Sequence, residues 1–138
     1  APTLWNDDIL PTQTMEQRWF AGVHTNIGGG YEKDGLANIP LHWILHHAQQ
    51  TGLEINYDYI KHYKPYFGHK LYKSSNLMYR MLGMGSNIRK ISLAKNQTID
   101  KSVQIRMDKD KSYHPKNIKT SSIFSDSLRV NKPTTEEN

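Results

Sequence analysis

The chain has 138 residues, enough for one domain of ordinary size, and 36% of them are hydrophobic, which predicts a small core. It contains no cysteine, which excludes disulfides and thiolate chemistry and fits a cytosolic setting. The formal net charge of +5 originates in residues 53–138, because residues 1–52 hold more acidic than basic side chains.

No apolar run approaches the ~20 residues that a membrane-spanning helix needs. The chain opens on Ala-Pro-Thr, without an initiator Met and without the charged and apolar regions of a signal peptide. We therefore expect a segment of a longer protein that is cytoplasmic, or that is secreted without a conventional signal peptide.

Residues 1–16 form a polar lead in which two prolines favour extended or irregular backbone. Residues 17–23 predict a short buried strand, because apolar side chains are concentrated there. The three successive glycines at 28–30 would cost a strand interior much conformational entropy. The strand is therefore expected to end near His24, with a turn over residues 24–31.

The next segment predicts a helix that ends at Gly52, a suitable C-terminal cap. Asn38 suits the N-cap, and Pro40 suits the first turn, where its missing N–H costs nothing. One apolar face of this helix is formed by Leu41, Ile44, Leu45 and Ala48. Strand, turn and helix make one α/β unit, with the helix packed on a sheet.

The remainder of the chain is more irregular. Residues 54–62 predict a short helix and residues 77–82 a packed apolar segment. Residues 98–107 predict a helix capped by Thr98. Residues 119–138 are rich in Ser, Thr, Asn and Lys and predict a disordered tail, so residues 1–118 would form the domain.

The histidine and glycine motif between Trp19 and Trp43 reads Trp-Phe-x-Gly-Val-His, three residues, Gly-Gly-Gly-Tyr, then Gly-Leu and a Trp-bearing helix. It resembles a bacterial and fungal family of uncharacterised α/β-hydrolase domains that includes lipase effectors of type VI secretion systems. Residues 2–5 and 100–117 resemble further segments of that family, with Asp100 in place of its usual histidine.

The resemblance implies an α/β fold, here the C-terminal part of an α/β-hydrolase-like sheet. It also implies a serine–acid–histidine triad in which His24 is the catalytic histidine. Thr25 and Asn26 depart from the Ser and Asp that the family usually carries there.

The serine and acid of such a triad precede the histidine in the chain. The sequence has no Gly-x-Ser-x-Gly, and the nearest candidate, residues 83–87, has the wrong order. Both groups are therefore expected upstream of residue 1, and the chain alone is expected to hydrolyse no ester.

Each of these residues also has a simpler interpretation. By residue type alone, His24 could be a hydrogen-bonded structural side chain. The glycines could cradle a phosphate, but they match neither a dinucleotide-binding motif nor a P-loop, so Gly28, Gly29 and Gly30 are expected to shape the turn around the site sterically.

The helix at 38–52 carries three histidines, His42, His46 and His47. His42 and His46 lie one turn apart and could share a metal, but no Glu lies between them as in His-Glu-x-x-His. The preferred interpretation is that these histidines lie on the side of the helix that faces solvent. Neither a metal nor another cofactor is predicted.

Residues 57–90 are basic and aromatic and could contact nucleic acid or an acidic membrane surface. No nucleic-acid motif is recognisable, so nucleic acid is disfavoured. The preferred interpretation is a solvated surface whose tyrosines pack on the core, and membrane contact comes second. The oligomeric state is not indicated.

Two functions follow. The first is the C-terminal segment of a serine hydrolase that acts on carboxylic esters. Its substrate in the complete protein would be a lipid or a small ester, and the enzyme could be a phospholipase. The segment contributes the catalytic His24 but lacks the nucleophilic serine. The alternative is a non-catalytic binding module derived from that fold, whose basic surface contacts an anionic partner.

Overall fold

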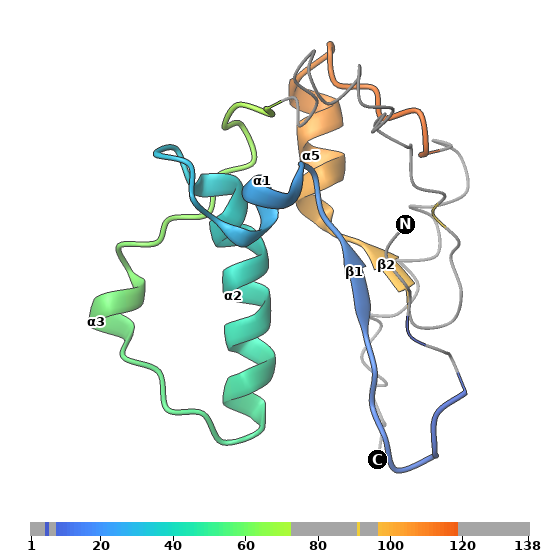
Figure 1. The fold of residues 1–138 in the computed structure, drawn as a ribbon, viewed down its shortest axis with the longest axis vertical. Helices are drawn as coiled ribbons and strands as arrows, with labels where there is room; N and C mark the ends of the chain where they lie inside the picture. Colours follow the sequence, from blue (N-terminus) through green and yellow to red (C-terminus); the bar gives the residue numbers. More distant parts are fainter. Residues whose placement is uncertain (1–4, 6–7, 73–90, 92–96, 119–138) are drawn as a thin grey trace, which may run out of the picture. The chain divides into compact units, whose positions relative to one another are not determined.

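The computed structural model describes residues 5, 8–72, 91 and 97–118 (Figure 1). The chain divides into two compact units. The first comprises Ala1–Trp19, Asn87–Ile99 and Pro115–Asn138, and the second comprises Phe20–Ser86 and Asp100–His114. The apolar segment predicted at 77–82 and the tail predicted at 119–138 lie outside the described residues.

The first unit contains a two-stranded parallel sheet of β1 (Gln17–Trp19) and β2 (Gln97–Ile99). Gln17 pairs with Gln97, and Trp19 pairs with Ile99. The Trp19 indole donates to the Gln97 side chain at 3.2 Å, which fixes this register across the strands. Parallel strands require a crossover connection, the arrangement of α/β proteins. The larger α/β-hydrolase-like sheet stays a prediction.

The strand predicted over residues 17–23 ends at Trp19, and the predicted turn starts as a short helix, α1 (His24–Gly28). Gly22 explains the early end of the strand. Its φ of +134° bends the chain, and a Cβ at this position would lie 2.4 Å from the Cβ of Asn26. The apolar composition that suggested a longer strand instead supplies buried Ala21 to the second unit.

The second unit is built around α2 (Gly35–Gln50), which α1 contacts (Figure 1). The helix ends at Gln50 and its C-cap is Thr51, one residue before the predicted cap Gly52, which has a φ of +100°. The predicted start is wrong: the N-cap is Asp34. Asn38 is buried inside the helix instead, where its amide donates to the Lys64 carbonyl at 3.3 Å.

The predicted apolar face of α2 is also only partly correct. Ile44 is 57% exposed. The most buried apolar positions lie in the first turns, at Leu36, Ala37 and Pro40. The core of this unit therefore gathers at the N-terminal part of α2 rather than along its length.

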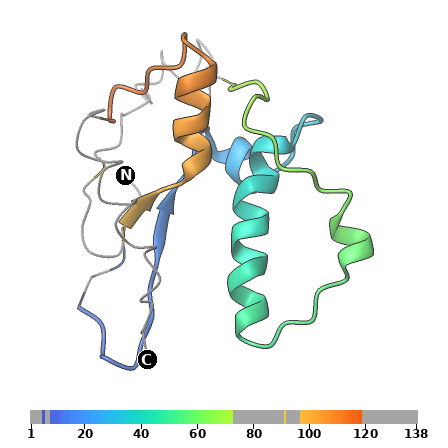
Figure 2. The same cartoon turned by 180° about the vertical axis from the view of Figure 1, so that it is seen from behind.

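After α2 the chain turns back through the four-residue helix α3 (Tyr57–Ile60) and returns toward the start of α2, as both views show (Figures 1 and 2). The Tyr66 N–H donates to the Gly35 carbonyl at 2.9 Å and closes this excursion. α3 is shorter than the helix predicted at 54–62.

Helix α5 (Lys101–Lys109) begins after Asp100, whose carboxylate accepts from the Ser102 N–H at 2.9 Å. The predicted cap, Thr98, is wrong because Thr98 lies in β2. α5 contributes Val103 and Arg106 to the interior of the second unit. None of the helices in the described ranges is both long and apolar enough to cross a bilayer.

Candidate active site

His24 is the first residue of α1, and it is exposed. Val23 precedes it in an extended conformation, and the Ile27 N–H donates to the Val23 carbonyl at 3.1 Å. The imidazole makes no hydrogen bond to any other residue that the structure describes. Its backbone is thus held in place while its ring remains accessible.

The side chain of Asn26 stabilises the start of α1 through two hydrogen bonds. It is only 2% exposed, its Oδ1 accepts from the Val23 N–H at 3.3 Å, and its Nδ2 donates to the Lys70 carbonyl at 3.3 Å. These two bonds need one acceptor and one donor, which an amide supplies and an ionised carboxylate does not. Asn26 therefore ties the His24 helix to a segment 44 residues away.

The glycines at the end of α1 adopt backbone angles that are energetically unfavourable for other residues. Gly28 ends α1, and Gly29 and Gly30 have φ values of +88° and +108°. The Gly29 N–H donates to the Thr25 carbonyl at 3.1 Å, so the turn folds back on α1. This geometry is that of a steric turn, and a role for the turn in shaping an active site stays a prediction.

The N-terminus of α2 is closed by a histidine from a distant loop. The Gly35 N–H donates to His69 Nδ1 at 2.8 Å, and a Cβ on Gly35 would lie 2.6 Å from that nitrogen. Asp34, the N-cap, makes no side-chain cap bond, so His69 satisfies a donor that the cap leaves open.

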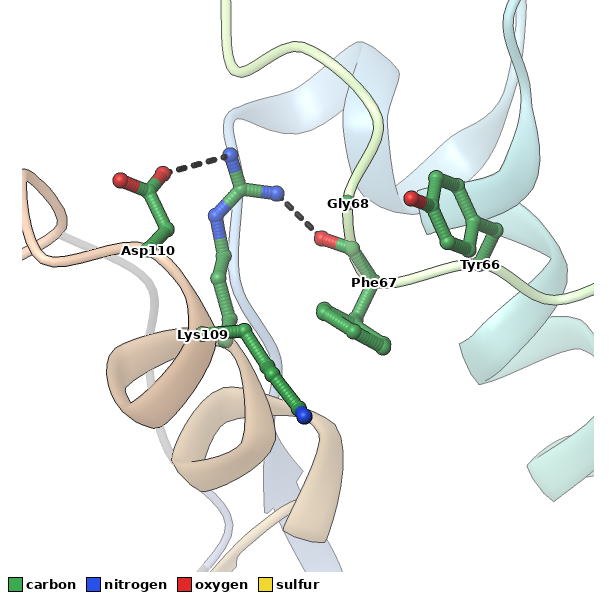
Figure 3. A pocket seen from close by; sticks show the side chains of 6 residues that line it. Tyr66, Phe67, Gly68, Lys109 and Asp110 are labelled. Atoms are coloured by element: carbon green, nitrogen blue, oxygen red, sulfur yellow. Dashed lines mark hydrogen bonds and ion pairs between the residues drawn. The ribbon is translucent and has the colours of Figure 1, made fainter.

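Arg106 of α5 donates to carbonyls of the same loop, and Figure 3 shows Phe67 of this loop with Asp110 and Lys109 around the hollow beside them. Arg106 is 6% exposed, donates through Nη1 to the carbonyls of Phe67 and His69, the latter at 2.8 Å, and places Nη2 3.7 Å from the Asp110 carboxylate. A hollow of about 440 Å³ beside it is lined by Tyr66, Phe67, Gly68, Arg106, Lys109 and Asp110. His24 is not among the lining residues.

Asp110 and Tyr113 titrate away from neutral pH. Hydrogen bonds from the Ser112 hydroxyl and N–H, aided by the Arg106 charge, hold the pKa of Asp110 below its usual value. Burial raises the pKa of Tyr113. Near neutral pH the carboxylate is thus ionised and the phenol neutral.

The histidines of α2 do not share one face. His42 is half-buried, with Nε2 2.7 Å from the Tyr63 carbonyl oxygen, so the prediction that it faces solvent is wrong. His46 is exposed, and His47 packs edge-on against Trp43. Across the described residues, no three or more His, Cys, Asp or Glu side chains gather as a metal site.

Residues 1–47 match the family described as "T6SS, Phospholipase effector Tle1-like, catalytic domain". The matched range holds β1, α1 and most of α2. This match confirms, over these residues, the predicted resemblance to lipase effectors of type VI secretion systems. No curated protein and no solved structure was found to match the chain.

Sequence reasoning missed three structural residues near α1 and α2: Gly22, His69 and Arg106. A signal existed for Gly22, because a glycine inside a strand pattern indicates a bend. Val103 and Arg106 lie three residues apart and share a helix face, which could have suggested that Arg106 is buried. Nothing local indicated His69, whose partner Gly35 is 34 residues away.

Proposed function

We propose that this chain is the part of a serine hydrolase that supplies the catalytic histidine for cleavage of carboxylic esters in phospholipids. The neutral His24 imidazole takes the proton of a serine hydroxyl and returns it to the leaving alcohol. The observation that carries this proposal is the exposed His24 ring on a fixed backbone inside the range that matches the phospholipase catalytic domain.

The serine and the acid of the triad belong to polypeptide outside these 138 residues. The sequence holds no Gly-x-Ser-x-Gly, and in α/β-hydrolases both groups precede the histidine. A carboxylate on the second ring nitrogen fixes the tautomer and stabilises the imidazolium that forms. The 138-residue chain by itself is inactive in this proposal, and the mechanism uses neither metal nor cofactor.

The neighbours of His24 serve to position it. Asn26 and Gly22 fix where α1 starts, and therefore where the ring emerges. Gly29 and Gly30, with their positive φ angles, let the chain turn directly after α1.

The proposal predicts the effect of His24→Ala in the complete protein that contains this chain. Loss of the general base lowers kcat/KM by about 10⁴-fold or more, while the thermal midpoint stays the same. The measurement is turnover of a water-soluble nitrophenyl ester and of a phospholipid. His46→Ala is the matched control, because His46 is another exposed histidine, and it retains at least about half of the activity.

Unchanged turnover in the His24→Ala protein would remove His24 from the mechanism. A complete protein without any esterase turnover, whose 138-residue segment nevertheless binds an anionic partner, would instead favour the binding-module alternative.

A further inference from the structure

The tyrosines of the second unit differ in their surroundings. Tyr57, Tyr59 and Tyr66 are 61%, 60% and 50% exposed, so the preferred expectation that the tyrosines of this region pack on the core is wrong for these three. Tyr72 is half-buried instead, and its ring stacks on that of Tyr31 with centroids 3.9 Å apart and planes inclined by 27°. The stack therefore joins two segments that are far apart in the sequence.

Tyr31 provides the first side chain after the three glycines that follow His24. Helix α1 has five residues, which are too few for a helix to be stable without other contacts. Gly29 and Gly30 have positive φ angles, and glycine restricts the backbone less than any other residue. Contacts with other segments must therefore hold α1, and His24 at its first position, in one place.

Tyr72 belongs to a segment that contacts this turn on both sides of the glycines. Before them, the Lys70 carbonyl accepts from Asn26 Nδ2 at 3.3 Å. After them, His69 Nδ1 accepts from the Gly35 N–H at 2.8 Å. The ring stack lies between these two bonds in the sequence, where the glycines leave the backbone least restricted.

The segment that carries Tyr72 is itself attached to α5. Arg106 donates to the carbonyls of Phe67 and His69, the latter at 2.8 Å. The Lys70 ammonium also lies 5.2 Å from the centroid of the Tyr72 ring, which stabilises the ring by a cation–π interaction. The Tyr72 ring is thus held by its own segment, so it can restrict the turn on which it stacks.

We propose that Tyr72 is a positioning residue for His24. By stacking on Tyr31 it holds the glycine turn, and with it the backbone of α1, where the imidazole meets the serine hydroxyl. A displacement of about 1 Å can lower the rate of an enzyme by about 100-fold, so such a residue affects turnover without touching the reacting atoms.

This inference rests on the proposed function, because the place of His24 affects turnover only if His24 is the general base. It goes beyond the family match, which covers residues 1–47 and therefore gives Tyr72 no role.

The test is Tyr72→Leu in the complete protein that contains this chain, because leucine keeps the apolar bulk and removes the flat ring. We expect kcat for a water-soluble nitrophenyl ester to fall by about tenfold, while KM stays within about twofold and the thermal midpoint within about 5 °C. Tyr72→Phe keeps the ring and retains kcat within about twofold of wild type. Tyr57→Leu, at an exposed tyrosine of the same unit, is the control and leaves kcat unchanged.

Two further measurements separate positioning from a general loss of structure. In the His24→Ala protein, Tyr72→Leu lowers the residual turnover no further, because a residue that acts through His24 has no effect without it. Hydrogen exchange followed by mass spectrometry does not depend on activity. A peptide covering residues 24–31 exchanges about tenfold faster in Tyr72→Leu, while a peptide covering residues 41–50 is unchanged.

Equal kcat in Tyr72→Leu and wild type, when His24→Ala has lost its turnover, would contradict this inference and leave the proposed function standing. An equal loss in Tyr72→Phe, or a further loss caused by Tyr72→Leu in the His24→Ala protein, would also overturn it. If Tyr72→Leu does not fold, Tyr31→Leu removes the other ring of the same stack, and unchanged kcat in that variant decides against the proposal.

Full turnover in the His24→Ala protein would contradict the proposed function and, with it, the role of Tyr72 in catalysis. Faster exchange of residues 24–31 in Tyr72→Leu would still show that the stack holds the turn, so the two failures are distinguishable.

Discussion

Asn26 shows how one atom decides what a buried position can do. The family resemblance in the sequence implies Asp at this position, so the sequence alone suggests that Asn is the loss of a charge. In the structure the amide nitrogen is the group that matters, because it donates to the Lys70 carbonyl, while Oδ1 accepts from Val23. The His24 helix therefore depends on a donor that Asp lacks in its ionised form.

Asn26→Asp is expected to lower the free energy of unfolding by about 1–3 kcal/mol, because a buried carboxylate would face the Lys70 carbonyl oxygen without a hydrogen between them. Urea unfolding followed at 222 nm measures it. Asn56→Asp is the matched control: Asn56 uses only its acceptor, as the cap of α3, where Asp performs equally well. An equal loss in both variants would show that the donor bond of Asn26 contributes nothing.

At the scale of the elements, the sequence predicted which helices exist better than where they begin. Residue type alone could not choose between neighbouring polar candidates for a cap. Asn38 is not the N-cap of α2, because it lies inside the helix and donates to a distant carbonyl. Thr98 is not the N-cap of α5, because it belongs to β2. The ends were easier, since Gly52 has the positive φ that few other residues adopt at little cost.

Asp100→Ala is expected to lower the free energy of unfolding by about 1 kcal/mol and to reduce helicity, because the Ser102 N–H loses its acceptor. Asp100→Asn keeps the cap and changes stability by at most about 0.3 kcal/mol. Thr98→Ala tests the original expectation and leaves the helical signal at 222 nm intact. A larger helical loss in the Thr98 variant than in the Asp100 variant would reverse the assignment of the cap.

At the scale of the whole molecule, the sequence could predict local elements and the candidate His24, but not the contacts that bring distant segments together. Trp19 with Gln97 and Gly35 with His69 are 78 and 34 residues apart. Such pairs cannot be recognised from hydrophobic periodicity, because the spacing of apolar residues shows which face of an element is buried but not which segment packs against that face. The division into two units could not be foreseen for the same reason.

Arg106 is the clearest test of these distant contacts. It joins the two chain segments of the second unit through bonds from one guanidinium to two carbonyls and a carboxylate. Arg106→Lys is expected to lower the free energy of unfolding of this unit by about 2–4 kcal/mol, because a single ammonium cannot reach all three acceptors. Urea unfolding followed by Trp43 fluorescence, with Trp5 and Trp19 replaced by Phe, reports on this unit. Lys109→Gln, at an exposed cation of the same helix, is the control and costs about 0.5 kcal/mol or less. Similar losses for the two variants would mean that the second unit does not depend on its buried guanidinium.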